Sequence, residues 1–186
     1  MKHYELELPQ DYKVDKVIDC KNPKTAFLLT LFSFIISIAI IVLGLVISLS
    51  LSTNQETYFD GLYALLTIVF LVVYIIIIIT HELIHGLFYK IFTKQKLTFG
   101  ISLSAAFCGV PNVYVRKKAM IVTCMAPCVT LSVLFIILMV VFVNSPIFIL
   151  FLLLFAIHFG GCVGDIYDFL LLLFKYRKKG VCQKFY

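Results

Sequence analysis

The stretch GLYALLTIVFLVVYIIIIITHELIH, residues 61–85, carries no charged residue or histidine until its end, where two histidines and a glutamate appear. A bilayer core is crossed by a helix of roughly 20 apolar residues, so this stretch predicts a transmembrane helix. An ionisable side chain near the centre of such a helix costs about 2.5–3.5 kcal/mol on insertion scales. His81, Glu82 and His85 therefore need a compensating partner, which points to a functional site.

The composition of the whole chain is that of a membrane protein. Its 186 residues are 62% hydrophobic and only 14% charged, with a mean hydropathy of +1.05, whereas soluble domains carry about 25% charged residues. Three further stretches are long and apolar enough to span a bilayer. We therefore predict an all-α polytopic membrane protein with four transmembrane helices, at about residues 26–53, 62–92, 119–143 and 147–174.

All lysines and arginines fall on one face of this four-span arrangement. The segment before the first span holds five, residues 86–118 hold six, and the tail from residue 175 holds five, whereas the loops 54–61 and 144–146 hold none. Short loops rich in these residues stay in the cytoplasm, so we predict a multi-pass protein of the cell membrane with both termini cytoplasmic. The net charge of +6 is explained by this pattern and suits contact with anionic lipid of the bilayer, so it requires no nucleic acid. The predicted organisation is a cytoplasmic segment 1–25, a transmembrane domain 26–174 and a basic cytoplasmic tail 175–186.

His81 and His85 are four residues apart and therefore project from one face of a helix, one turn apart. In this spacing two imidazole nitrogens can bind one zinc ion, and the glutamate after the first histidine can take a proton from a zinc-bound water. The same short pattern also occurs by accident, and histidines in a bundle can simply be hydrogen-bonded. The cost of three ionisable residues in one span favours the zinc interpretation, with one Zn²⁺ ion and Glu82 as general base.

Catalytic zinc usually has three protein ligands, and the last span offers candidates for the third. At a rise of about 1.5 Å per residue from the inner surface, Asp165 and Asp168 come out at depths similar to those of the two histidines, whereas His158 comes out too deep. Small residues let another helix approach closely, so the glycine-rich segment 160–164 favours Asp165 as the ligand. Asp168 would then orient a histidine or cap the water. Spacing alone does not show which of the two aspartates is the ligand.

Residues 97–115, between the second and third spans, predict a short cytoplasmic β-hairpin or loop. Apolar and polar residues alternate from Leu97 to Leu103, which is typical of a strand; residues 113–115 are the predicted return strand, with Gly109, Pro111 and Asn112 in the turn. A hairpin beside a zinc site would offer a free edge to an extended substrate. The candidate substrate-edge residues are Phe99, Ile101 and Leu103. An amphipathic loop resting on the inner leaflet is the alternative.

Pro127 interrupts the third span at a depth close to that of the histidines. Its missing N–H frees a carbonyl, which could open a path for water or substrate, or simply accompany a packing kink.

Four motifs together resemble the membrane family described as "putative zincin peptidase", which is related to the site-2 proteases: ELPQDYK at 7–13, HELIH at 81–85, MAPC at 125–128 and GDIYD at 164–168. This resemblance implies an intramembrane zinc metalloprotease that acts on membrane-associated proteins or peptides. It also implies that His81, His85 and Asp165 bind zinc and that Glu82 is the general acid/base.

Three classes of function could explain these residues. An intramembrane metalloprotease explains the glutamate between the histidines, the aspartate at matching depth and the nearby strand. A divalent-metal transporter would need polar groups along a route to the other side, whereas the outer halves of the four spans contain no Asp, Glu, Lys or Arg and, of the histidines, only His158. A noncatalytic metal-binding scaffold would not require Glu82. We therefore expect the metalloprotease, with the other two as alternatives.

Overall fold

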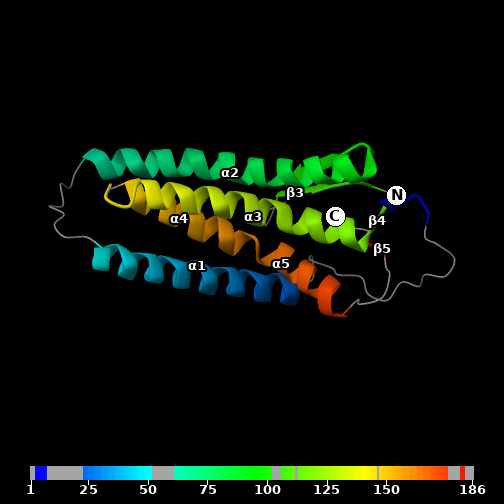
Figure 1. Cartoon of the computed structure of the whole chain (residues 1–186), viewed down its shortest axis with the longest axis horizontal. Coiled ribbons are helices and arrows are strands. Elements are labelled where there is room, and N and C mark those ends of the chain that lie inside the picture. Colours follow the sequence, from blue (N-terminus) through cyan, green and yellow to red (C-terminus); the bar gives the residue numbers. More distant parts are fainter. Residues whose placement is uncertain are drawn as a thin grey trace.

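The computed structural model describes residues 3–7, 23–51, 61–101, 106–111, 113–145, 147–175 and 181–182. The helices are α1 (Pro23–Leu51), α2 (Gly61–Thr93), α3 (Lys117–Val141), α4 (Ile147–Gly161), α5 (Val163–Leu170) and the π-helical turn η1 (Leu171–Lys175). The strands are β1 (Tyr4–Glu5), β2 (Thr98–Ile101), β3 (Ala106–Gly109), β4 (Tyr114–Arg116) and β5 (Val181–Cys182). The helices form an elongated bundle, and β1, β3, β4 and β5 lie toward the end that also holds both chain termini (Figure 1). We call this end the strand end.

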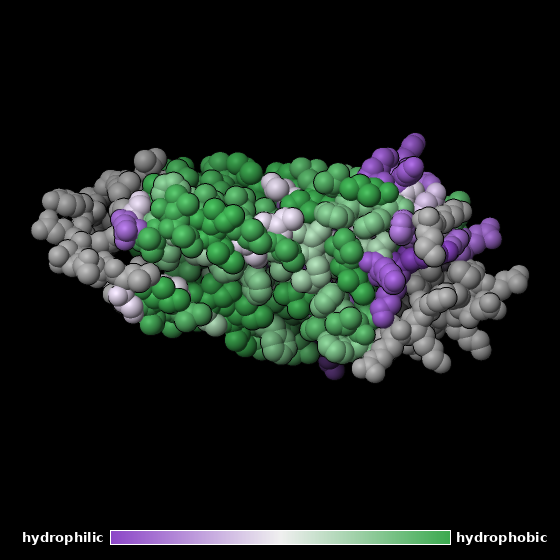
Figure 2. Space-filling model, in the orientation of Figure 1, coloured by the Kyte–Doolittle hydropathy of each residue, from purple (hydrophilic) through white to green (hydrophobic). Residues whose placement is uncertain are grey.

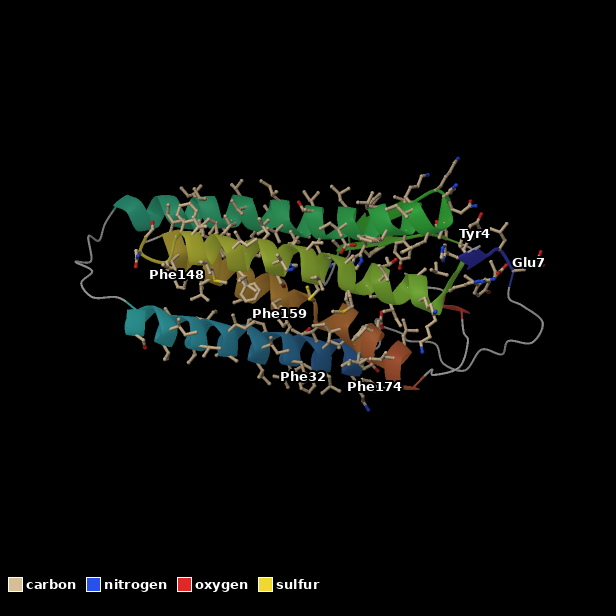
Figure 3. All side chains as sticks on the ribbon, in the orientation of Figure 1. Tyr4, Glu7, Phe32, Phe148, Phe159 and Phe174 are labelled. Atoms are coloured by element: carbon tan, nitrogen blue, oxygen red, sulfur yellow. The ribbon has the colours of Figure 1, made fainter. Side chains whose placement is uncertain are left out.

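Three of the described helices, α1, α2 and α3, are each long and apolar enough to cross a membrane, and α4 with α5 and η1 makes a fourth if the bent pair is counted as one span. Figure 2 shows an apolar surface along the bundle, with hydrophilic residues gathered mainly at the strand end. Phe148, Phe159 and Phe174 follow one another along the bundle toward the strand end, so the bent pair runs its length (Figure 3). The prediction of a mostly helical chain with membrane-length helices is confirmed.

The fourth span differs from the prediction because it is broken rather than continuous. The axes of α4 and α5 meet at an angle of 41°. At the break the Cys162 N–H is shared between the carbonyls of His158 and Phe159, at 3.1 Å each. Gly160 and Gly161 stand directly before it. Glycine costs about 1 kcal/mol relative to alanine within a helix, and helices kink where such weak positions cluster.

Helix α1 packs closely against α4 at Gly160. A Cβ atom on Gly160 would lie 2.8 Å from the carbonyl oxygen of Ser33 and would collide with the hydroxyl of Ser37. The expectation that the glycines admit another helix therefore holds for Gly160, with α1 as that helix. It does not hold for Gly161 or Gly164, where an added Cβ would meet no atom within 4 Å.

The predicted hairpin is present, but its return strand was wrongly assigned. Strand β2 pairs antiparallel with β3, from Thr98 opposite Gly109 to Ile101 opposite Ala106. In this register the Phe107 ring occupies the space that a side chain on Gly100 would need. The pairing thus matches a large ring with a residue that has no side chain.

Residues 114–116 belong instead to a second, three-stranded sheet with the order β1-β4-β5. Val115 pairs with Tyr4 on one side and with Cys182 on the other. The Arg116 N–H donates to the His3 carbonyl at 2.9 Å, and its guanidinium pairs with Glu5 at 2.7 Å. Both outer strands have two residues, too few for a periodic pattern to reveal them in the sequence.

Two clusters of buried apolar side chains fill the bundle. The cluster at the strand end consists of Tyr89, Cys108, Val110, Val113, Val115, Ala119, Met120, Cys124 and Leu172. The second cluster, toward the other end, consists of Ile77, Leu131, Phe135, Leu150 and Leu154. Helix α2 contributes Tyr89 to the first cluster and Ile77 to the second. The HELIH motif lies between them.

Candidate metal centre

His81 and His85 lie on the interior face of α2, as their spacing predicts. Their rings meet edge to face, with centroids 4.8 Å apart. His85 is only 4% exposed. One turn further along the same face, the Tyr89 hydroxyl donates to the Met120 sulfur of α3 at 3.5 Å. The face that carries both imidazoles is therefore packed against α3.

Asp165 lies in the first turn of α5, directly after the break, and is 8% exposed. Its Oδ2 atom is 3.1 Å from His81 Nε2 and 3.2 Å from His85 Nε2. Adjacent ligands of a tetrahedral zinc ion, whose bonds are about 2.0–2.2 Å long, have similar separations. The three donor atoms lie close enough together to hold one metal ion.

The hydrogen bond at the other nitrogen of His85 indicates which tautomer a neutral ring has. His85 Nδ1 lies 2.9 Å from the carbonyl oxygen of Thr123 in α3. A carbonyl only accepts, so Nδ1 carries the hydrogen, and a neutral imidazole then has its lone pair on Nε2. That lone pair faces Asp165 Oδ2, which is also an acceptor. A divalent cation between these two acceptors would bind both, so the residues fit the zinc ion that the sequence predicts.

The remaining predicted residues lie around this group. Glu82 is half-buried on α2, beside His81, and Asp168 is half-buried one turn beyond Asp165. A Cβ on Gly86, directly after His85, would lie 3.1 Å from the ring of Phe99, so β2 packs against the same helix. Ile101 ends β2, and Leu103 lies outside the described residues. The functional roles of all of these residues stay predictions.

His158 lies nearer to the candidate metal ligands than the sequence predicted. It is 5% exposed, and its ring centroid is 5.6 Å from that of His81. Its Nε2 lies 3.7 Å from the Cys162 sulfur, and His81, His158 and Cys162 form a second group of potential metal ligands. The depth estimate assumed a straight helix, whereas this span bends at Cys162. The spacing of His158 and Cys162, one turn apart, was the signal that could have identified the pair.

Comparisons with known proteins agree with the geometry at the level of family. No curated protein and no solved structure matches the chain. Residues 74–181 match a family described as "Putative zincin peptidase". This region covers more than half of the chain and includes the two histidines of α2 and Asp165 of α5. The description suggests a metallopeptidase that uses zinc, whereas the predicted relationship to site-2 proteases stays a prediction. The chain belongs to the zincin peptidase family that this description names.

Proposed function

We propose that the protein is an intramembrane zinc metalloprotease that hydrolyses peptide bonds of membrane-associated substrates near the cytoplasmic face of the cell membrane. The observation that carries this proposal is the convergence of His81 and His85 on Asp165 Oδ2, at 3.1 and 3.2 Å, within a bundle of membrane-length helices. These three residues would hold one Zn²⁺ ion. The family match supports the metallopeptidase class.

When bound, zinc supplies a water whose pKa is lowered toward about 7 and polarises the substrate carbonyl. Glu82 is the general base that takes a proton from the attacking water and later gives a proton to the leaving amine nitrogen. It follows His81 in α2, about 100° further around the helix, so its carboxylate stands beside the histidine face rather than within it. The flanking apolar clusters lower the local dielectric and strengthen these electrostatic interactions.

Strand β2 is the proposed docking edge for substrate. Among the described strands it pairs only with β3, and the ring of Phe99 reaches α2 at Gly86. An extended peptide added to this edge would bond through its main chain, with Phe99, Ile101 and Leu103 as contact residues. Substrates N-methylated at alternate amides should be cleaved poorly only when the methyl groups fall on the amides facing β2. Equal cleavage in both registers would contradict this docking mode.

The proposed orientation puts the strand end in the cytoplasm. Both described terminal strands lie at that end, which agrees with an even number of crossings. The lysine and arginine distribution in the sequence then favours the cytoplasmic side for both termini.

The decisive experiment replaces Glu82 by glutamine, which keeps the shape of the side chain but cannot accept the proton. Zinc content of the purified protein should stay near that of the wild type. Cleavage of a single-span substrate in liposomes should fall by about 10²–10⁴-fold, which is roughly 3–5.5 kcal/mol of activation barrier. Glu5→Gln is the matched control, because Glu5 lies in β1 and pairs with Arg116. Wild-type cleavage by Glu82→Gln would reject the mechanism.

A divalent-metal transporter is the second candidate. The second ligand group at His158 and Cys162 shares His81 with the first, so an ion could pass from one group to the other. Beyond His158, however, the outer halves of the spans carry no charged residue or histidine. In a transporter, or in a noncatalytic metal-binding scaffold, Glu82→Gln would cause no selective loss of cleavage.

A further inference from the structure

Pro127 lies inside α3 and is fully buried. In an α-helix the N–H of each residue bonds to the carbonyl four residues earlier, which for residue 127 is that of Thr123. Proline has no N–H, so the Thr123 carbonyl lacks the helical partner that any other residue would supply. Within a bilayer a freed backbone group must find another partner, usually on a neighbouring helix.

That partner is a residue of the metal centre. The Thr123 oxygen accepts the hydrogen bond from His85 Nδ1 at 2.9 Å, and both residues are buried. The same imidazole presents Nε2 to Asp165 at 3.2 Å. The carbonyl that the proline frees and the imidazole bonded to it thus lead from α3 to the candidate ion site.

We infer that Pro127 is a positioning residue for the metal site: by withholding an N–H from Thr123, it reserves that carbonyl to orient His85 and to keep its Nε2 unprotonated. This inference rests on the metal site of the proposed function. An ordinary residue at position 127 would donate to the same carbonyl and draw its oxygen toward the axis of α3. His85 would then lose its fixed orientation and its fixed tautomer.

Metal binding by the purified full-length protein tests this directly, with Co²⁺ as the probe. Groups that orient a metal-bound histidine contribute about 10–100-fold to metal affinity, so Pro127→Ala should raise the Co²⁺ dissociation constant by about that factor. The matched variant carries lactic acid, the α-hydroxy analogue of alanine, at position 127. It has the alanine side chain but no N–H, and should bind Co²⁺ nearly as well as the wild type.

The outcomes separate the role of the N–H from that of the kink. Wild-type affinity in Pro127→Ala would overturn the inference, and so would an equal loss in both variants, since that would assign the effect to the proline ring.

A measurement on the unmutated chain keeps the inference testable if Pro127→Ala misfolds. In protein labelled with ¹⁵N-histidine and freed of metal, the His85 resonance, assigned by its loss in His85→Gln, should report hydrogen on Nδ1. Hydrogen on Nε2 alone would refute the inference. Neither readout depends on cleavage. The inference can therefore fail while the protease proposal stands, and the protease proposal can fail while the inference stands.

Discussion

Adjacent glycines at the end of α4 should respond oppositely to the same substitution. Gly160→Ala places a methyl group where α1 passes, 2.8 Å from the Ser33 carbonyl oxygen, whereas Gly161→Ala places it where no atom lies within 4 Å. Neither glycine has a positive φ, so alanine suits both backbones. The pair therefore isolates the helix–helix contact from the intrinsic effect of removing glycine.

The expected magnitudes follow from these contacts. At Gly160 the Ser37 hydroxyl must move, which breaks its 2.9 Å hydrogen bond to the Ala156 carbonyl at a cost of about 1 kcal/mol. The Ser33 carbonyl belongs to the backbone, so α1 must shift, and such overpacking costs about 1–3 kcal/mol. Replacing glycine by alanine in a helix stabilises the fold by about 0.5–1 kcal/mol at either position. The free energy of unfolding should therefore fall by about 1–3.5 kcal/mol in Gly160→Ala and rise by about 0.5–1 kcal/mol in Gly161→Ala.

Reversible unfolding in mixed micelles measures this difference. The purified variants would be titrated with a denaturing detergent, and the loss of helix followed by circular dichroism. Gly160→Ala should unfold at a lower fraction of denaturing detergent than the wild type, and Gly161→Ala at a higher one. If Gly160→Ala proved as stable as Gly161→Ala, the close approach of α1 to α4 would be refuted.

Two further predictions concern the metal and the membrane. Asp165→Ala should strip zinc from the purified protein about as severely as His85→Ala, while His158→Ala should leave it bound; metal analysis of the three variants decides, and full zinc in Asp165→Ala would move the ligand role to another group. Reporters fused after Tyr186 and within the loop 54–60 should lie on opposite sides of the membrane with the tail cytoplasmic, and an extracellular tail would reject the proposed orientation.

The sequence alone predicted those features that depend on local spacing. Apolar length identified the membrane-length helices, and the four-residue spacing of His81 and His85 put both rings on one face. Asp165 was matched to them by depth along the chain, which succeeded because it lies on the strand-end side of the break. The same estimate failed for His158, which lies beyond the break.

Features that depend on contacts between distant segments were not predictable in this way. The return strand of the hairpin was chosen from turn residues, whereas the register depends on the Phe107 ring over Gly100. The hydrogen bond between His85 and Thr123 joins residues on two helices. Pro127 indicated in the sequence that one carbonyl lacks its helical hydrogen bond, but only the packing of α2 on α3 shows which group donates to that carbonyl.

The three-stranded sheet constrains the order in which the protein can fold. Strand β4 is the central strand, so its two edges are completed by Tyr4 and by Cys182, from nearly opposite ends of the chain. During synthesis β1 has no partner until both α1 and α2 have been made, and β5 emerges only after every helix. Pairings of such sequence separation form late and slowly, because loop closure precedes any gain from contact. We therefore expect the sheet to assemble last, so that its completion marks a chain whose helices have all been synthesised.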